Sequence, residues 1–259
     1  MLLPRLIARL DIKGPNVVKG IHFEGLRVMG KPAEMAERYA NQGAHELLYI
    51  DTVASLYGRN QLETLIQETA ERVFIPITVG GGISDCKSVN RLLRAGADKV
   101  AVNTAALERP ELIRELADQF GSQAITVSIQ VKRRTDGAAS GKYEAYAECG
   151  RQRTEYDAVQ WGCEAVRLGA GEILLTSIDR DGTMKGCDLD LICALRLPVP
   201  VVAGGGIGTV QHVNDALSAG ADAVAIGSAL HYNKLTFAEV EHGITKSNFP
   251  GKTGVRRAA

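Results

Sequence analysis

Short apolar runs recur along this 259-residue chain, and each is about as long as a buried β-strand. They lie near residues 6–10, 47–50, 75–79, 99–102, 124–129, 173–177, 199–203 and 223–226. Amphipathic segments of helical length separate most of them, and parallel strands that are covered on both faces read as continuous apolar runs. Eight strands alternating with helices predict the α/β class and, within it, a single (β/α)8 TIM barrel.

Two stretches of the chain repeat each other without a gap, residues 79–105 and residues 203–229, at a constant spacing of 124 residues. In each stretch an apolar run ends in three glycines, a helical pattern follows, and the block Ala-Gly-Ala-Asp leads into a second apolar run. The spacing is about half the length of the chain, so the repeat predicts a barrel built from two duplicated half-barrels.

The predicted barrel fills residues 1–243 as one domain. Residues 131–153 interrupt the pattern because they are polar and contain Asp-Gly and Ser-Gly turn signals, which predict a hairpin inserted after the fifth strand. Residues 244–259 contain a proline, two glycines and a pair of arginines, and we expect them to form a poorly ordered tail.

The charge balance and the cysteine content exclude several classes of protein. Lys and Arg total 30 and Asp and Glu also total 30, so no basic field points to a nucleic-acid partner. The five cysteines form no C-x-x-C pair and the five histidines show no ligand spacing, so we expect no disulfide framework, metal or other cofactor. No apolar run approaches the ~18 residues of a membrane span, which predicts a soluble, cytoplasmic protein without membrane contact.

The C-terminal ends of the strands in such a barrel face one mouth, where residues that are distant in the sequence meet. Asp11 lies at the end of the first strand and Gln130 at the end of the fifth, so a carboxylate and a carboxamide are predicted on opposite sides of the mouth. Each triple glycine is matched by a following strand that ends beside a small hydroxyl residue, Thr104 or Ser228. Glycine N–H groups and such a hydroxyl bind anions, so two phosphate cradles are predicted.

Several further segments stand in a characteristic order, among them Leu-Asp-Ile-Lys at 10–13, Val-Val-Lys-Gly at 17–20, Val-Gly-Gly-Gly-Ile at 79–83 and Asp-Arg-Asp-Gly-Thr at 179–183. With them the sequence resembles the cyclase subunits of imidazole glycerol phosphate synthase over nearly its whole length. Members of that family join ammonia to a bis-phosphorylated aminoimidazole carboxamide ribonucleotide and release imidazole glycerol phosphate and aminoimidazole carboxamide ribotide. The resemblance implies a carbon–nitrogen lyase of histidine biosynthesis, in a heterodimer with a glutaminase at the N-terminal face of the barrel.

The resemblance also implies roles for individual residues. It makes Asp11 the general acid and base, places Lys19 on a mobile first loop that closes over the substrate, and puts Gln130 where the family has a second catalytic aspartate. The residues implied to bind the substrate are Gly82, Asn103 and Thr104 for one phosphate, Gly205, Gly206, Gly227 and Ser228 for the other, and Thr176, Asp181 and Gly182 for the part between them.

Four charged residues lie where strands begin, at the opposite end of the barrel from the mouth. They are Arg5, Glu46, Lys99 and Glu172. One interpretation is a salt-bridged plug that stabilises the barrel. The other, which follows the resemblance, is a gate on the path of ammonia.

Gln130 is the main departure from the family pattern. Ring closure and cleavage move protons in two directions, and two carboxylates with different pKa values divide that work, whereas a carboxamide does not titrate. We therefore expect this chain to close and cleave the ring slowly. Two alternatives follow from the same residue: an accessory relative that delivers ammonia to another acceptor such as a surface sugar, and a weak enzyme that binds and activates its glutaminase as a scaffold.

Overall fold

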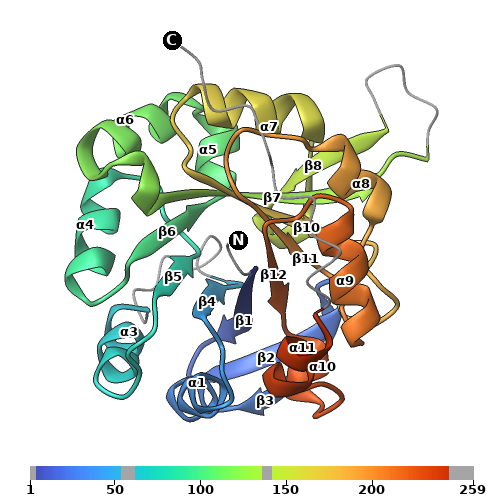
Figure 1. Cartoon of the computed structure of the whole chain (residues 1–259). Helices are drawn as coiled ribbons and strands as arrows, with labels where there is room; N and C mark the ends of the chain where they lie inside the picture. The colour runs from blue at the N-terminus through green and yellow to red at the C-terminus, as the bar shows by residue number, and fades with distance from the viewer. Residues whose placement is uncertain (1–3, 54–61, 136–141, 245–259) are drawn as a thin grey trace.

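The computed structural model of the chain describes residues 4–53, 62–135 and 142–244. Eight parallel strands follow one another in the order β1-β4-β5-β6-β7-β10-β11-β12, and β12 pairs back to β1. Figure 1 shows these strands as an inner ring with helices around it. The (β/α)8 barrel that the apolar runs predict is confirmed.

The bounds of the elements follow the predicted alternation of strands and helices. The barrel strands are β1 (Arg5–Lys13), β4 (Glu46–Asp51), β5 (Ile77–Gly80), β6 (Lys99–Val102), β7 (Ile125–Arg133), β10 (Glu172–Ser177), β11 (Val201–Gly204) and β12 (Ala223–Ile226). The helices are α1 (Pro32–Asn41), α3 (Leu62–Ala70), α4 (Cys86–Arg94), α5 (Thr104–Glu108), α6 (Glu111–Phe120), α7 (Ala158–Arg167), α8 (Leu189–Ala194), α9 (Val210–Ser218), α10 (Ser228–His231) and α11 (Phe237–Gly243). Across the described residues, none of these helices is long and apolar enough to cross a membrane.

The two copies of the repeat fold alike because equivalent residues make equivalent bonds. Asp98 closes the first Ala-Gly-Ala-Asp block, and its carboxylate accepts a hydrogen bond from the N–H of Ile77 at the start of β5 (2.8 Å). Asp222 closes the second block and accepts in the same way from Val201 at the start of β11 (2.9 Å). Each carboxylate ties the turn before one strand to the start of its neighbour, which helps to set the register within each half-barrel.

Side chains along β1 alternate between the outside of the barrel and its lumen. Leu6, Ala8 and Leu10 belong to the main core between the strands and the helices. A second apolar cluster, which we call the collar, fills the middle of the lumen and consists of Ile7, Leu48, Ile50, Ala101, Leu174, Val202, Ala223 and Ala225. Polar side chains therefore lie at the two ends of the lumen, above and below the collar.

Two antiparallel additions extend the C-terminal end of the barrel. β2 (Asn16–Ile21) pairs with the end of β1 and with β3 (Glu24–Gly30). β8 (Tyr143–Ala147) pairs with the end of β7 and with β9 (Gln152–Asp157), in and just after the stretch where the sequence predicts a hairpin. Residues 136–141 of that stretch, and residues 245–259 of the predicted tail, lie outside the described residues.

Candidate functional site

Asp11 near the end of β1 and Gln130 near the end of β7 line the same cavity at the mouth. Both are buried, with 4% and 5% of their surfaces exposed. The side-chain oxygen of Gln130 has no hydrogen-bond donor among the described residues. A buried carbonyl oxygen without a donor is rare in proteins, so this atom marks a place where a donor from a bound molecule would be stabilised.

Asp11 is paired with two cations. Arg9 donates from Nε to one carboxylate oxygen and Lys19 donates from Nζ to the other, each at 2.8 Å. Burial alone raises the pKa of Asp11, but the two positive charges outweigh burial and hold that pKa well below its usual range. Asp11 is therefore an ionised carboxylate whose ability to accept a proton is masked by ion pairing.

Lys19, expected on a mobile first loop, is a buried residue of strand β2 and connects that strand to the turn that follows β10. Besides Asp11, its Nζ donates to Asp181 in that turn, at 2.8 Å from Oδ2. Burial lowers the pKa of Lys19, but the two carboxylates raise it above its usual value. Gly182 has a φ of +78°, and a Cβ added to it would lie 2.2 Å from the carbonyl oxygen of Gly20. The missing side chain lets the turn approach β2 closely.

The hairpin of β2 and β3 covers the mouth. The N–H of His22 donates to the carbonyl oxygen of Asp181 (2.9 Å), and its ring Nδ1 lies 2.8 Å from the carbonyl oxygen of Ile178. The ring of Phe23 lies over the guanidinium of Arg9, 5.6 Å from it. The covered mouth keeps two small cavities of about 10 Å³ each, which is room for about one water molecule apiece.

Arg9 is part of the mouth although the sequence interpretation did not single it out. It is 4% exposed, it lines both small cavities, and its Nη1 donates to the hydroxyl of Thr176 on β10 (3.0 Å). A signal for it was present in the sequence. Arg5, Arg9 and Asp11 occupy odd positions of one strand, so the alternation that places Asp11 in the lumen places Arg9 just below it.

Two other titratable side chains near the mouth are held neutral by burial. Burial raises the pKa of the Cys149 thiol to about 11, and the charge of Asp11 adds to the rise. Burial also lowers the pKa of His231 to about 4, and the charge of Lys19 acts in the same direction. Neither side chain changes its charge near neutral pH.

The second glycine turn forms a cradle next to the mouth. Gly205, Gly206, Gly227 and Ser228 all line the same small cavity. Gly205 and Gly206 have positive φ angles, and a Cβ on Gly206 would lie 2.2 Å from the carbonyl oxygen of Gly186. The hydroxyl of Ser228 is buried without a partner among the described residues. Glycine N–H groups beside an unused hydroxyl suit an anion.

The first glycine turn also contains glycines with positive φ, but the side chains beside it are already bonded. Asn103 donates from Nδ2 to carbonyl oxygens on β7 and β8 (2.9 and 3.1 Å). The hydroxyl of Thr104 accepts from the N–H of Glu148 (3.0 Å). Gly82 keeps a positive φ of +63°. Asn103 and Thr104 therefore tie β6 to its neighbours, which leaves mainly the glycine backbone to receive an anion.

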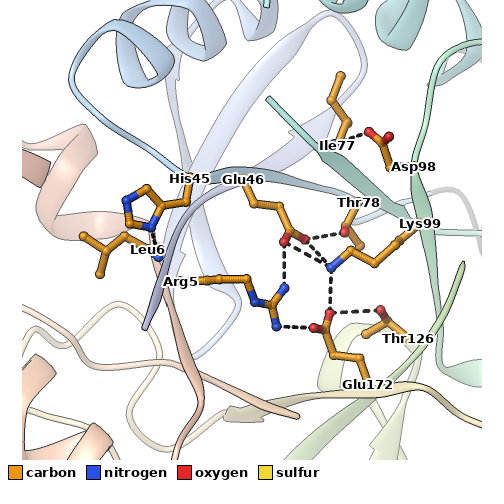
Figure 2. A network of polar contacts seen from close by, with 10 residues as sticks. All are labelled: Arg5, Leu6, His45, Glu46, Ile77, Thr78, Asp98, Lys99, Thr126 and Glu172. Atoms are coloured by element: carbon orange, nitrogen blue, oxygen red, sulfur yellow. Dashed lines mark hydrogen bonds and ion pairs between the residues drawn. The ribbon is translucent and has the colours of Figure 1, made fainter. Parts of the chain in front are cut away.

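The four charged residues at the strand starts form a closed ring across the N-terminal end of the lumen, as Figure 2 shows. Arg5 donates to Glu46 (2.8 Å) and to Glu172, and Lys99 bridges the same two carboxylates (2.9 and 3.1 Å). A threonine hydroxyl from β5 and one from β7 also donate to them (2.6 and 3.2 Å). Each of the four carboxylate oxygens accepts at least one bond, so the charges of the ring are fully paired with one another and with the two hydroxyls.

A larger cavity of about 360 Å³ lies outside the mouth, next to α8 and α9. Its lining includes Arg133 and Asp188, which are bonded to each other (2.7 Å), and the exposed Asp190, which also pairs with Arg133 (3.1 Å). The lining also holds Arg180, Lys185 and Asp215, so its basic and acidic side chains balance. Because Asp11 is not in this lining, the reactive carboxylate and the glycine cradles, rather than this larger space, define the candidate site.

The fold and the mouth together define a (β/α)8 barrel whose chemistry is assembled from residues at the C-terminal ends of its strands. The chain belongs to the family described as histidine biosynthesis protein, which matches residues 5–236. It is by this membership an enzyme of histidine biosynthesis.

Several relatives extend over most of the chain. Imidazole glycerol phosphate synthase subunit HisF of Thermobifida fusca is 48% identical over 252 residues, which cover 96% of this chain and 98% of that protein. The protein of the same name from Legionella pneumophila is 54% identical over 212 residues, covering 81% of this chain and 98% of its own length. That of Streptomyces coelicolor is 46% identical over 251 residues, covering 96% and 98%. These relatives agree with the resemblance and give no support to the surface-sugar and scaffold alternatives.

Proposed function

We propose that this chain is the ammonia-using cyclase subunit of an imidazole glycerol phosphate synthase, a carbon–nitrogen lyase that works with a glutaminase. The observation that carries the proposal is the ionised Asp11, which lines one cavity with the carboxamide of Gln130. A glycine cradle lies beside this cavity. The Gln130 oxygen and the Ser228 hydroxyl of the cradle have no hydrogen-bond partner among the described residues. This arrangement suits a phosphorylated substrate whose reacting part lies over Asp11. The family and the names of the relatives support the reaction.

The proposed chemistry depends on a few side chains. Ammonia condenses with the bis-phosphorylated ribonucleotide, the imidazole ring closes, and cleavage releases imidazole glycerol phosphate and aminoimidazole carboxamide ribotide, with loss of a water molecule overall. Asp11 accepts protons as the base once Lys19 turns from it toward the anionic substrate, and Gln130 orients the substrate or a water molecule. The remaining proposed contacts are the glycine turn at Gly82 for one phosphate, with Asn103 and Thr104 holding the neighbouring strands in place. For the other phosphate they are Gly205, Gly206, Gly227 and Ser228, and between the two phosphates Thr176, Asp181 and Gly182.

The glutaminase is proposed to dock on the N-terminal face, against the charged ring. Arg5 of the ring keeps a third of its side chain exposed on that side. Phe74, shortly before β5, is 93% exposed, and exposed aromatic side chains are common anchors of protein interfaces. Ammonia released into water near neutral pH is mostly protonated and loses its nucleophilic lone pair, whereas a path through the ring and the collar would keep it neutral.

Ammonium-dependent turnover tests the proposed function. The chain is mixed with the bis-phosphorylated ribonucleotide and an ammonium salt at alkaline pH, and release of the carboxamide ribotide is measured. We expect slow release that requires both compounds. If the folded chain binds the substrate without releasing product, the proposed reaction is wrong, and if it does not bind the substrate, the proposed cradles are wrong as well.

Replacing Gln130 by aspartate is expected to raise the ammonium-dependent rate about tenfold or more, because a second titratable group would share the proton transfers. The measurement is kcat for release of the carboxamide ribotide in the variant and in the unmodified chain. Gln130→Asn is the matched control, because it keeps a carboxamide and should give no gain. Rapid turnover by the unmodified chain together with a slower Gln130→Asp variant would contradict the view that the carboxamide at position 130 limits the proton transfers.

The equivalent hydroxyls of the two cradles are expected to respond differently to removal. Ser228→Ala should raise KM about tenfold and leave the melting temperature unchanged. No group in the described part of the chain bonds to its hydroxyl, and a hydrogen bond to a charged group contributes about 1.5–3 kcal/mol. Thr104→Val should instead lower stability by about 1 kcal/mol, because the N–H of Glu148 loses its acceptor. KM reports the weaker substrate binding expected for Ser228→Ala, and thermal unfolding reports the lower stability expected for Thr104→Val. Equal changes in KM and in stability for both variants would contradict the difference between the two cradles.

A further inference from the structure

The two cations that hold Asp11 are fixed in different ways. The guanidinium of Arg9 also donates to the hydroxyl of Thr176 (3.0 Å) and lies under the ring of Phe23. Arg9 is therefore anchored in the wall of the lumen on several sides.

Lys19 is anchored differently, because its ammonium group donates to two carboxylates, Asp11 and Asp181. It belongs to β2, in the hairpin that covers the mouth, whereas Arg9 lies on the same strand as Asp11 and on the same face of that strand. An anionic substrate that enters the mouth competes with the carboxylates for the Lys19 ammonium. The pairing of Arg9 with Asp11 belongs to the barrel itself and does not depend on the position of the hairpin.

We propose that Arg9 is a positioning residue for Asp11. Arg9 stays paired with the Asp11 carboxylate when Lys19 turns to the substrate, and it keeps Asp11 oriented and in its base form during the reaction. The kinetic part of this inference rests on the proposed function. The structural part concerns the carboxylate of Asp11 alone and can be tested without substrate.

The charged groups around Asp11 indicate that Arg9 controls whether the Asp11 carboxylate stays ionised. The residue across the mouth is the uncharged Gln130, so no second carboxylate there opposes the ionisation of Asp11. The other charged or titratable side chains around the mouth are Lys19, Asp181, Cys149, His231, Arg151 and Asp51. Once Lys19 has turned away, Arg9 is the cation that remains bonded to Asp11.

The kinetic test compares the unmodified chain with Arg9→Met, which keeps an apolar stem but removes the charge, and with Arg9→Lys, which keeps the charge. The acid limb of kcat/KM reports the free enzyme and that of kcat reports the enzyme–substrate complex. In the unmodified chain the kcat limb should lie below the usual range of an aspartate. Arg9→Met should move the kcat limb upward by about one to three pH units. A nearby opposite charge lowers a carboxyl pKa by about that amount, so removing the guanidinium raises the pKa of Asp11. Activity is lost below that pKa because a protonated carboxyl group no longer acts as a base. Arg9→Lys should restore most of the difference.

The test without substrate follows the Asp11 carboxyl by carbon NMR in the chain labelled at its aspartates. The signal of Asp11 is the one that Asp11→Asn lacks. Its titration midpoint should rise in Arg9→Met and return toward the original value in Arg9→Lys. A structural role alone predicts a lower melting temperature with unchanged titration, and unchanged midpoints in both the NMR and the kcat profiles would overturn the proposal.

Thr176→Val keeps the inference testable should Arg9→Met fail to fold. It removes the second anchor of the guanidinium without touching Asp11 and nearly conserves volume. We expect a smaller upward shift of the same NMR midpoint, and a midpoint identical to that of the unmodified chain would count against a positioning role. If the unmodified chain shows no turnover at all, the proposed function fails while the NMR titration still decides the role of Arg9.

Discussion

Replacing Asp11 by asparagine is expected to reduce ammonium-dependent turnover at least about a hundredfold, since a positioned acid or base typically contributes a factor of about 10²–10⁴. Asparagine has nearly the shape of aspartate, but its amide cannot take up a proton. The measurement is the rate of carboxamide ribotide release at saturating substrate and ammonium. The loss should appear in kcat, because the cradles that bind the phosphates are left intact.

The Asp11→Asn variant also leaves Arg9 and Lys19 without their shared carboxylate, so its folding has to be checked. Lys19 retains Asp181 and Arg9 retains Thr176, and we therefore expect a lower melting temperature but a folded barrel. Asp85→Asn is the matched control, because this exposed residue caps α4 and asparagine caps helices equally well. A folded Asp11→Asn variant with undiminished turnover would remove Asp11 from the chemistry.

The barrel could be predicted from the sequence because its signals are local and repeated. The apolar runs mark buried parallel strands, and the Ala-Gly-Ala-Asp blocks contain the side chains, Asp98 and Asp222, that cap the strand starts. The bonds of those carboxylates lie within one half-barrel, so a pattern along the chain is enough to indicate them.

The site could be predicted only in part, because its details depend on contacts between distant strands. Thr104 and Ser228 are equivalent in the repeat, yet the hydroxyl of Thr104 is bonded to Glu148, whereas no described residue bonds to that of Ser228. Glu148 follows β8, whose hairpin differs in sequence from the β2–β3 hairpin at the equivalent place in the other half-barrel. The positive φ of Glu148 is not indicated by its residue type. The repeat therefore predicts two equal cradles, and the structure shows two unequal ones.

Arg9 illustrates a different limit of the sequence interpretation. The family motif includes Asp11 and Lys19. Arg9 instead lies within an apolar run, where the pattern indicates a buried strand and gives an arginine no function. Its anchor Thr176 is 167 positions away, and the ring that covers its guanidinium, Phe23, comes from the hairpin. Only the closed barrel brings these groups together.

At the other end of the lumen, Lys99→Ala is expected to uncouple the two half-reactions in the complex with the glutaminase. Lys99 bridges two carboxylates that are less than 10% exposed, so its loss leaves Arg5 alone between Glu46 and Glu172 and opens the ring. Product formed per glutamine hydrolysed should fall about tenfold, while turnover with added ammonium salt should stay within about twofold. Because Arg5 still pairs with both carboxylates, the loss of stability should be smaller than the about 3–5 kcal/mol of a fully broken buried pair.

Three measurements on the same preparations distinguish an ammonia gate from a structural plug as the role of the charged ring. They are the rates of glutamine hydrolysis, of product formation from glutamine, and of product formation from ammonium salt. Lys87→Ala is the matched control, because it truncates an exposed lysine on α4 outside the ring. Arg5→Ala should repeat the uncoupling from the other side of the ring, since Arg5 pairs with the same two carboxylates. If both ring variants lose the two product-forming activities in parallel with their melting temperatures, the four charges form a structural plug and ammonia takes another path.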